Sequence, residues 1–149
     1  YANWLDQLRD APTFRSYPDR TAFAARLQKE NLRLSAEKAC YLAQFMGEDD
    51  GAGGIRQAAD PHHRWVNPII YRVEEAKSIW RRVTAPVLWV TAADSVIFKQ
   101  LFAIDSEDYR SRLACFRELR EVTVQDCGHN LHHDQPQQVA QMIEEFFIA

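Results

Sequence analysis

The spacing of apolar residues divides the chain into a helical first half and a second half that contains strands. In the first half these residues recur every three or four positions, which is typical of helices that bury one face. We predict a short helix before Pro12, a second helix that Asp19 caps and that runs to about Lys29, and a third that Ser35 caps. Aspartate and serine accept hydrogen bonds from the first helical amides, so each marks a helix start.

A glycine-rich run at 51–54 interrupts this pattern and predicts a flexible loop after the third helix. A short extended segment over residues 55–60 is expected to follow. Asn67-Pro68 then predicts the start of a long helix that reaches about Val83 and turns Ile69, with other apolar residues, inward.

Two strands are predicted in the second half. The apolar run 87–91 is typical of a strand that is buried on both faces. Residues 122–126 begin with alternating apolar and polar side chains, the pattern of a half-buried strand. A helix that starts at Asp105 or Ser106 and turns Tyr109 inward connects them. The order strand, helix, strand favours a crossover connection, in which the two strands run parallel.

A terminal helix is predicted after the second strand. Asp134 is expected to cap it, and Pro136 lies in its first turn. Its apolar residues fall on one face: Val139, Ala140, Ile143, Phe146 and Phe147. The succession of elements therefore indicates an α/β fold.

Asp94 and His129 are the candidate functional residues. Each follows one of the two strands, and the carboxyl ends of parallel strands are where open α/β sheets place their chemistry. We therefore expect the two side chains at the same rim of the sheet, within or near hydrogen-bonding reach. A carboxylate that accepts the Nδ1 proton of a histidine fixes the tautomer of the ring and stabilises its charged form. Such a pair activates a hydroxyl, a thiol or water.

Two stretches of the sequence resemble α/β-hydrolases. APVLWVTAAD ends at Asp94, as the penultimate core strand of that family ends at its acid. VQDCGHNLHHDQPQQVAQMIEEFF carries His129 between the last strand and an amphipathic terminal helix. In that family the catalytic residues occur in the chain order Ser, Asp or Glu, His. The resemblance is strong from Trp80 onward and loose before it, where the helices are similar to the cap that such enzymes insert.

The resemblance implies a partial α/β-hydrolase fold: a helical cap over residues 1–83, then the strand-helix-strand-helix part of a parallel core over residues 84–149. It implies Asp94 as acid and His129 as base in the hydrolysis of an ester or similar bond of a small apolar substrate, without metal or cofactor. The sequence has no Gly-x-Ser-x-Gly elbow for the nucleophile. We therefore expect the serine upstream of Tyr1, in a native N-terminal part that this chain lacks.

Two other functions stay open. The chain could be a non-catalytic interaction module that keeps the surface of the fold without its chemistry. It could also be a relative of epoxide hydrolases and dehalogenases, whose nucleophile is an aspartate. Residues upstream of Tyr1 would distinguish the three functions, by showing Gly-x-Ser-x-Gly, Gly-x-Asp or neither motif.

A metal site is a further alternative around His129. This part of the sequence is rich in residue types that bind zinc: Cys127, His129, His132, His133 and Asp134. Their spacing matches neither a zinc finger nor a His-Glu-x-x-His helix. We therefore expect no metal.

Composition and charge narrow the choice of partners. The net charge of −3, with arginines interleaved among acidic residues, argues against nucleic acid, and no apolar run approaches the length of a membrane span. Three cysteines predict no disulfide framework and favour a reducing, cytoplasmic compartment. The apolar strand at 87–91 needs neighbours on both faces. We therefore expect a protein partner besides the small-molecule substrate, either the missing N-terminal half or another copy in a homo-oligomer.

Overall fold

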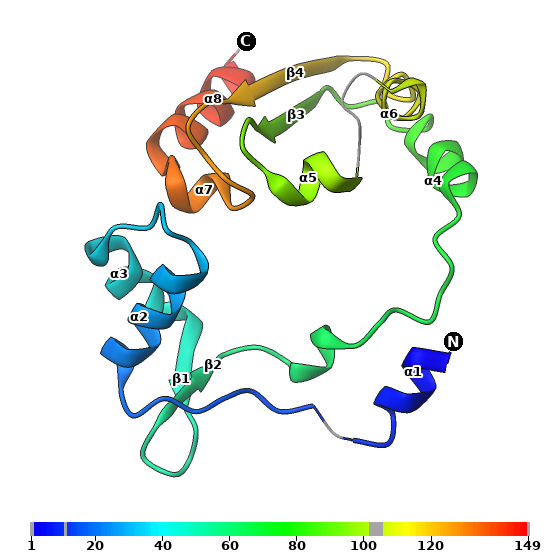
Figure 1. Ribbon diagram of the computed structural model, residues 1–149. Helices are drawn as coiled ribbons and strands as arrows, with labels where there is room; N and C mark the ends of the chain where they lie inside the picture. Colours follow the sequence, from blue (N-terminus) through cyan, green and yellow to red (C-terminus); the bar gives the residue numbers. More distant parts are fainter. Residues whose placement is uncertain (1, 11, 102–105, 149) are drawn as a thin grey trace. The chain divides into compact units, whose positions relative to one another are not determined.

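The computed structural model describes residues 2–10, 12–101 and 106–148 (Figure 1). Contacts divide the chain into two compact units, residues 1–71 and 72–149, which we call the first unit and the second unit. No helix among the described residues is both long enough and apolar enough to cross a membrane. The functional division into a cap over 1–83 and a core over 84–149 stays a prediction.

The first unit is mainly helical. Helices α2 and α3 pack against each other, and a short antiparallel hairpin follows α3 directly (Figure 1). The elements in chain order are α1 (Ala2–Gln7), α2 (Arg20–Glu30), α3 (Ala36–Met46), β1 (Gly47–Asp49), β2 (Ile55–Gln57) and the 3₁₀ helix η1 (Pro61–Arg64). The three helices predicted for this part of the sequence are thus confirmed.

Side-chain caps determine where α2 and α3 begin. The Asp19 carboxylate accepts a hydrogen bond from the Ala22 amide at 2.7 Å, and the Ser35 hydroxyl accepts one from the Lys38 amide at 3.2 Å. The facing sides of the two helices then bury a small core: Phe23, Ala24, Leu34, Ala39 and Ala43. The predicted caps and the helical period therefore account for this packing.

The sequence predicts β2 but not its partner β1. The two strands pair antiparallel, with Glu48 opposite Arg56, and these side chains form an ion pair at 2.9 Å. The three residues of β1, Gly-Glu-Asp, contain no apolar side chain, so no alternation marks them as a strand.

The long helix predicted from Asn67 to Val83 is wrong in its first part. Only α4 (Val73–Trp80) is helical there. The Asn67 side chain accepts a hydrogen bond from the Ile69 amide at 2.9 Å, which makes a local turn instead of a helix cap. Ile69, predicted to face inward, is exposed. An Asn-Pro pair opens turns as readily as helices, so the spacing of apolar residues alone misplaced the start.

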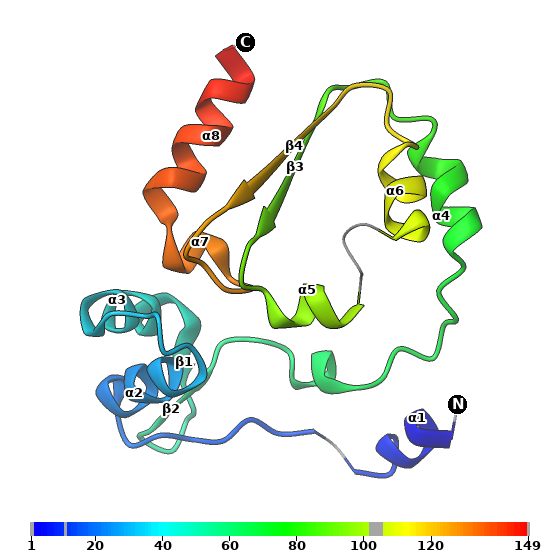
Figure 2. The ribbon, with the colours of Figure 1, turned by 45° about the horizontal axis from the view of Figure 1, so that its top comes forward.

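The second unit contains the predicted pair of parallel strands. Strands β3 (Val87–Ala92) and β4 (Leu119–Val124) lie side by side and run in the same direction (Figure 2). β4 starts earlier than predicted and ends before Asp126, whose φ of +52° does not fit a strand. The remaining elements are α4, α5 (Val96–Leu101), α6 (Glu107–Leu113), α7 (Leu131–Asp134) and α8 (Pro136–Ile148).

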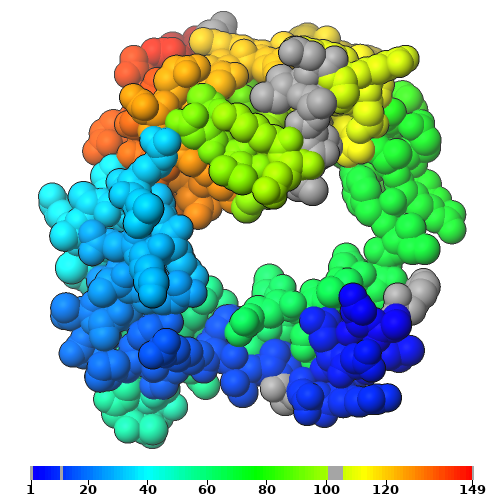
Figure 3. All heavy atoms as spheres, viewed as in Figure 1, coloured from blue at the N-terminus to red at the C-terminus, as the bar shows by residue number. Residues whose placement is uncertain are grey.

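Two helices, instead of the one predicted, lie between β3 and β4. Ser106 caps α6 by accepting a hydrogen bond from the Tyr109 amide at 3.2 Å, as predicted, while Asp105 lies outside the described residues. The sequence does not predict α5 because its first three residues, 96–98, form a short apolar run that does not distinguish a helix from a strand. In the space-filling view α5 lies at the near surface of its unit (Figure 3).

Tyr109 fastens α6 to both strands. Its side chain is buried, and its hydroxyl accepts a hydrogen bond from the Trp89 indole N–H at 3.0 Å and donates one to the Glu121 carboxylate at 3.1 Å. Burial, followed by the nearby Glu121 carboxylate, raises the pKa of Tyr109 above its ordinary value. This network joins β3, α6 and β4.

Helix α8 covers the sheet only in part. Met142 packs against the core cluster that contains Val124 and Cys127. Ile143 and Phe147, predicted to lie on the apolar face, are exposed, and no described residue of α8 is buried. The apolar face that the sequence predicts is therefore largely uncovered.

Candidate active site

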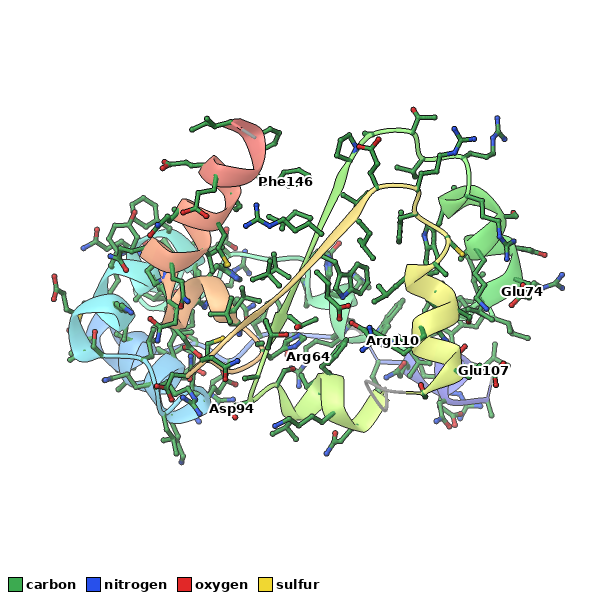
Figure 4. The ribbon with its side chains drawn as sticks, turned by 90° about the horizontal axis from the view of Figure 1, so that it is seen from above. Arg64, Glu74, Asp94, Glu107, Arg110 and Phe146 are labelled. Carbon is green, nitrogen blue, oxygen red and sulfur yellow. The ribbon has the colours of Figure 1, made fainter. Side chains whose placement is uncertain are left out.

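The loops that follow β3 and β4 are hydrogen-bonded to each other beyond the strands. The Ala93 amide donates to the Val124 carbonyl at 2.9 Å, and the Asp94 amide donates to the Cys127 carbonyl at 3.1 Å. Asp94 lies where β3 ends and α5 begins (Figure 4). The structure therefore brings the Asp94 loop and the loop that carries His129 together at one end of the sheet, as the parallel pairing predicts.

Asp94 is a partly exposed carboxylate with a cation near it. The Lys99 ammonium, on α5, lies 3.9 Å from its Oδ1 atom, and the Asp94 side chain is 45% exposed. An exposed pair at this distance contributes little to stability. The carboxylate is accordingly partly exposed to solvent at this end of the sheet.

His129 contacts a residue that the sequence analysis does not single out. Its Nδ1 atom lies 3.2 Å from the hydroxyl of Ser95, the residue directly after Asp94. Ser95 is 2% exposed, and its hydroxyl also accepts a hydrogen bond from the Phe98 amide at 3.1 Å. Ser95 thus caps α5 and holds one side of the imidazole ring. A serine directly ahead of the apolar residues 96–98 is the signal that could have identified this cap.

The contact with Ser95 is compatible with two tautomers of His129. A serine hydroxyl has one proton to donate and two lone pairs, and the Phe98 amide occupies one lone pair. When the other lone pair accepts the Nδ1 proton, Nε2 is left as a free base. When the hydroxyl donates to Nδ1 instead, Nε2 carries the proton. Only the first arrangement lets His129 remove a proton through Nε2.

A direct hydrogen bond between Asp94 and His129 stays a prediction. The structure places both residues at the same end of neighbouring parallel strands, and the hydrogen bond it describes for Nδ1 is the one with Ser95. Ser95 does not take the place of the missing nucleophile. It is buried and faces Nδ1, while the nucleophile of a Ser-His-Asp arrangement faces Nε2.

Asp134 organises the loop that carries His129. Its buried carboxylate accepts a hydrogen bond from the Gly128 amide at 2.7 Å, which closes the loop between β4 and α7. The predicted cap of α8 is therefore wrong, because Asp134 is the last residue of α7. Pro136 begins α8, as predicted. The Asp134 carboxylate thus fixes the backbone of Gly128, the residue before His129.

The histidines of α7 do not assemble into a metal site in the described part of the chain, where no group of three or more metal-binding side chains converges. The rings of His132 and His133 instead meet edge to face, with centroids 4.2 Å apart. Burial, with His132 as the second cause, lowers the pKa of His133 below its ordinary value, against the opposing effect of Asp134.

Comparisons with known proteins find similarity in structure only. No family model and no curated protein matches the chain. Similar solved structures include a thioesterase domain from the curacin biosynthetic pathway, with a TM-score of 0.73, 22% identity and coverage of 97% of this chain and 49% of that one. The structure of E-2-(acetamidomethylene)succinate hydrolase matches with a TM-score of 0.66 and 17% identity, over 98% of this chain and 51% of that one. An esterase from Mycobacterium tuberculosis matches with a TM-score of 0.70 and 12% identity, over 91% of this chain and 43% of that one.

These similarities establish the fold. The chain has part of the α/β-hydrolase fold, which confirms the fold predicted from the resemblance. It spans about half the length of the solved structures it matches.

Proposed function

We propose that this chain supplies the acid Asp94 and the base His129 of a hydrolase that cleaves an ester or similar bond in a small, fairly apolar substrate. The observation that carries the proposal is the backbone bond between Asp94 and Cys127, which joins the two loops at the end of the parallel strands. The thioesterase, hydrolase and esterase structures of the same fold support it.

In this mechanism His129 removes a proton from a nucleophile through Nε2 and returns it to the leaving group. In the assembled site Asp94 takes the place of Ser95 as the acceptor of the Nδ1 proton and stabilises the charged ring, while the backbone bond between Asp94 and Cys127 keeps the two loops together. The sequence has no Gly-x-Ser-x-Gly motif for a nucleophile elbow and no recognisable motif for an oxyanion hole. A further segment or chain therefore has to supply the serine, and the chain alone is expected not to turn over esters.

The test is a hydrolase assay on the assembly that the tagged chain forms in its native cells. We expect that assembly to hydrolyse a p-nitrophenyl ester and to react with a fluorophosphonate probe. His129→Ala is expected to lower kcat/KM by about 10³-fold or more, because no other group then moves the proton. The purified chain without its partner is expected to be inactive.

His62→Ala is the matched control. His62 also pairs with an aspartate, because its Nδ1 lies 2.6 Å from the Asp60 carboxylate, yet it belongs to the first unit. Its replacement is expected to leave kcat/KM unchanged. Equal losses in the His62 and His129 variants would refute the assigned base. Turnover without fluorophosphonate labelling would favour the aspartate nucleophile, and an assembly with no hydrolase activity would favour the interaction module.

A further inference from the structure

The first unit contains a pocket that the proposed hydrolysis does not use. Its volume is about 670 Å³, within the range of pockets that bind small ligands. Helix α2 forms one wall, while the end of α3, β2 with the residues after it, η1 and the segment before α2 contribute the rest. All of its lining residues lie between 14 and 64, so the pocket belongs to the first unit alone.

Five large apolar side chains line the pocket. Phe23 and Leu27, on α2, meet Phe14, Tyr17 and Met46 there. The rings of Tyr17 and Phe23 pack with centroids 5.4 Å apart, and Phe23 is fully buried. Apart from Phe23 these side chains are partly exposed, so they provide an apolar surface on which a hydrocarbon chain gains free energy by leaving water.

Positive charge surrounds this apolar part. The lining includes four cations and a single carboxylate, His63 aside, although the chain as a whole has a net charge of −3. Arg26 pairs with that carboxylate, Glu30. Arg15 lies over the Tyr17 ring at 5.5 Å, and neither it nor Lys29 or Arg64 has a carboxylate partner among the described residues. The pocket therefore leaves three positive charges uncompensated.

We propose that the pocket binds an amphipathic anion, with an apolar chain on the Phe23 side and a carboxylate or phosphate group beside Arg15, Lys29 and Arg64. A neutral ligand would leave these cations without a counter-charge, and a cationic ligand would be repelled. Arginine favours both anions because its planar guanidinium matches their oxygen atoms. The inference concerns the first unit only, so it does not depend on hydrolysis in the second.

Isothermal titration calorimetry of the full chain with three probes of equal chain length tests the proposal. We expect decanoate or decyl phosphate, each kept below its micelle concentration, to bind at least about tenfold more tightly than decan-1-ol, because only the anions satisfy the cations. The tighter of the two anions then identifies the head group. Equal affinity for the alcohol, or no binding of any probe, would overturn the proposal.

Charge variants locate the binding. Arg15→Gln and Lys29→Gln are each expected to weaken binding of the preferred anion by about twofold to fivefold, the range for one exposed charge, without changing the circular dichroism spectrum. Arg33→Gln, which removes an exposed cation outside the pocket, is the matched control and is expected to have no effect. His129→Ala is expected to bind the anion normally even though it abolishes hydrolysis. If Arg33→Gln weakened binding of the anion as much as the other two changes, the proposed site would be refuted.

Discussion

The orientation of the His129 ring depends on Ser95, a side chain that is itself fixed. The Ser95 hydroxyl is buried and accepts a hydrogen bond from the Phe98 amide, so the start of α5 sets its position. A ring held through Nδ1 keeps Nε2 for proton transfer. The orientation of the His129 ring therefore depends on the folding of α5, the short helix that follows β3.

Ser95→Ala is expected to lower the free energy of unfolding by about 1–2 kcal/mol, because it removes a helix cap and the partner of His129. Urea denaturation of the chain measures this difference. Ser78→Ala is the control, since Ser78 is exposed and donates only to the Glu75 carbonyl of its own helix. That change is expected to stay within about 0.5 kcal/mol. If Ser95→Ala were as stable as Ser78→Ala, the hydrogen bonds of the Ser95 hydroxyl would contribute nothing to stability.

Tyr109→Phe tests the network that joins α6 to the strands. It leaves the Trp89 indole N–H without its partner, and we expect a loss of about 1–3 kcal/mol in the free energy of unfolding near neutral pH. The folded pKa of Tyr109 lies above the ordinary 10.0. The stability that its protonated hydroxyl provides is therefore complete below that pH and is lost as the pH rises through the folded pKa.

The Tyr109→Phe variant has no hydroxyl to titrate at this position. The difference between its free energy of unfolding and that of the wild type is therefore expected to shrink at high pH. Urea denaturation between about pH 8 and pH 11 follows the difference. Tyr41→Phe, which alters an exposed tyrosine, is expected to show no such trend. A constant deficit across this range would contradict the assigned titration.

At the scale of elements, the Asp134 carboxylate stabilises the loop between β4 and α7, in addition to the backbone bond between Asp94 and Cys127. The Asp134 side chain is buried and accepts the Gly128 amide, the residue next to His129. We expect Asp134→Ala to speed hydrogen exchange of the Gly128 amide by about tenfold or more, because its protected state then opens more easily. Gln138→Ala, an exposed change on α8, is expected to leave that exchange rate unaltered. Unchanged exchange in both variants would show that the bond does not protect the loop.

Elements with a side-chain cap or a clear alternation of apolar residues could be predicted from the sequence, whereas α5 and α7 could not. Caps and apolar spacing identify α2, α3 and the parallel strands, and the pairing of those strands then places Asp94 and His129 at one rim. Helix α7 has only four residues, and α5 opens with three consecutive apolar residues, 96–98, which do not distinguish a helix from a strand. Asn67 was misread because its side chain forms a turn. The contact between Ser95 and His129 depends on tertiary packing, which no local pattern encodes.

At the scale of the whole molecule, the described part of the parallel sheet consists of β3 and β4 alone. Each strand keeps an open edge, and all four residues Val87–Val90 remain partly exposed although the run is apolar on both faces. On α8, Phe147 is 81% exposed and Ile148 is 84% exposed. We propose that a partner covers these surfaces, either the segment that carries the nucleophile or a second copy of this chain.

The chain purified alone is accordingly expected to self-associate in size-exclusion chromatography with light scattering. Phe147→Glu is expected to shift it toward the monomer, because a charge on the uncovered face of α8 opposes apolar association. Leu32→Glu places the same charge at an exposed apolar position of the first unit and is expected to have little effect. A well-folded monomer in the unmodified chain would contradict the expectation.

The central claim is that Asp94 and His129 act as one catalytic unit. A double-mutant cycle in kcat/KM, measured on the assembly recovered with the chain, tests it most directly. Asp94→Asn is expected to lower kcat/KM roughly 10²-fold to 10⁴-fold, because the His129 ring loses the group that fixes its tautomer. Once His129→Ala is present, the Asp94 change is expected to cost almost nothing more, since residues that work as a unit are not additive. Two losses that multiply fully in the double variant would contradict the account.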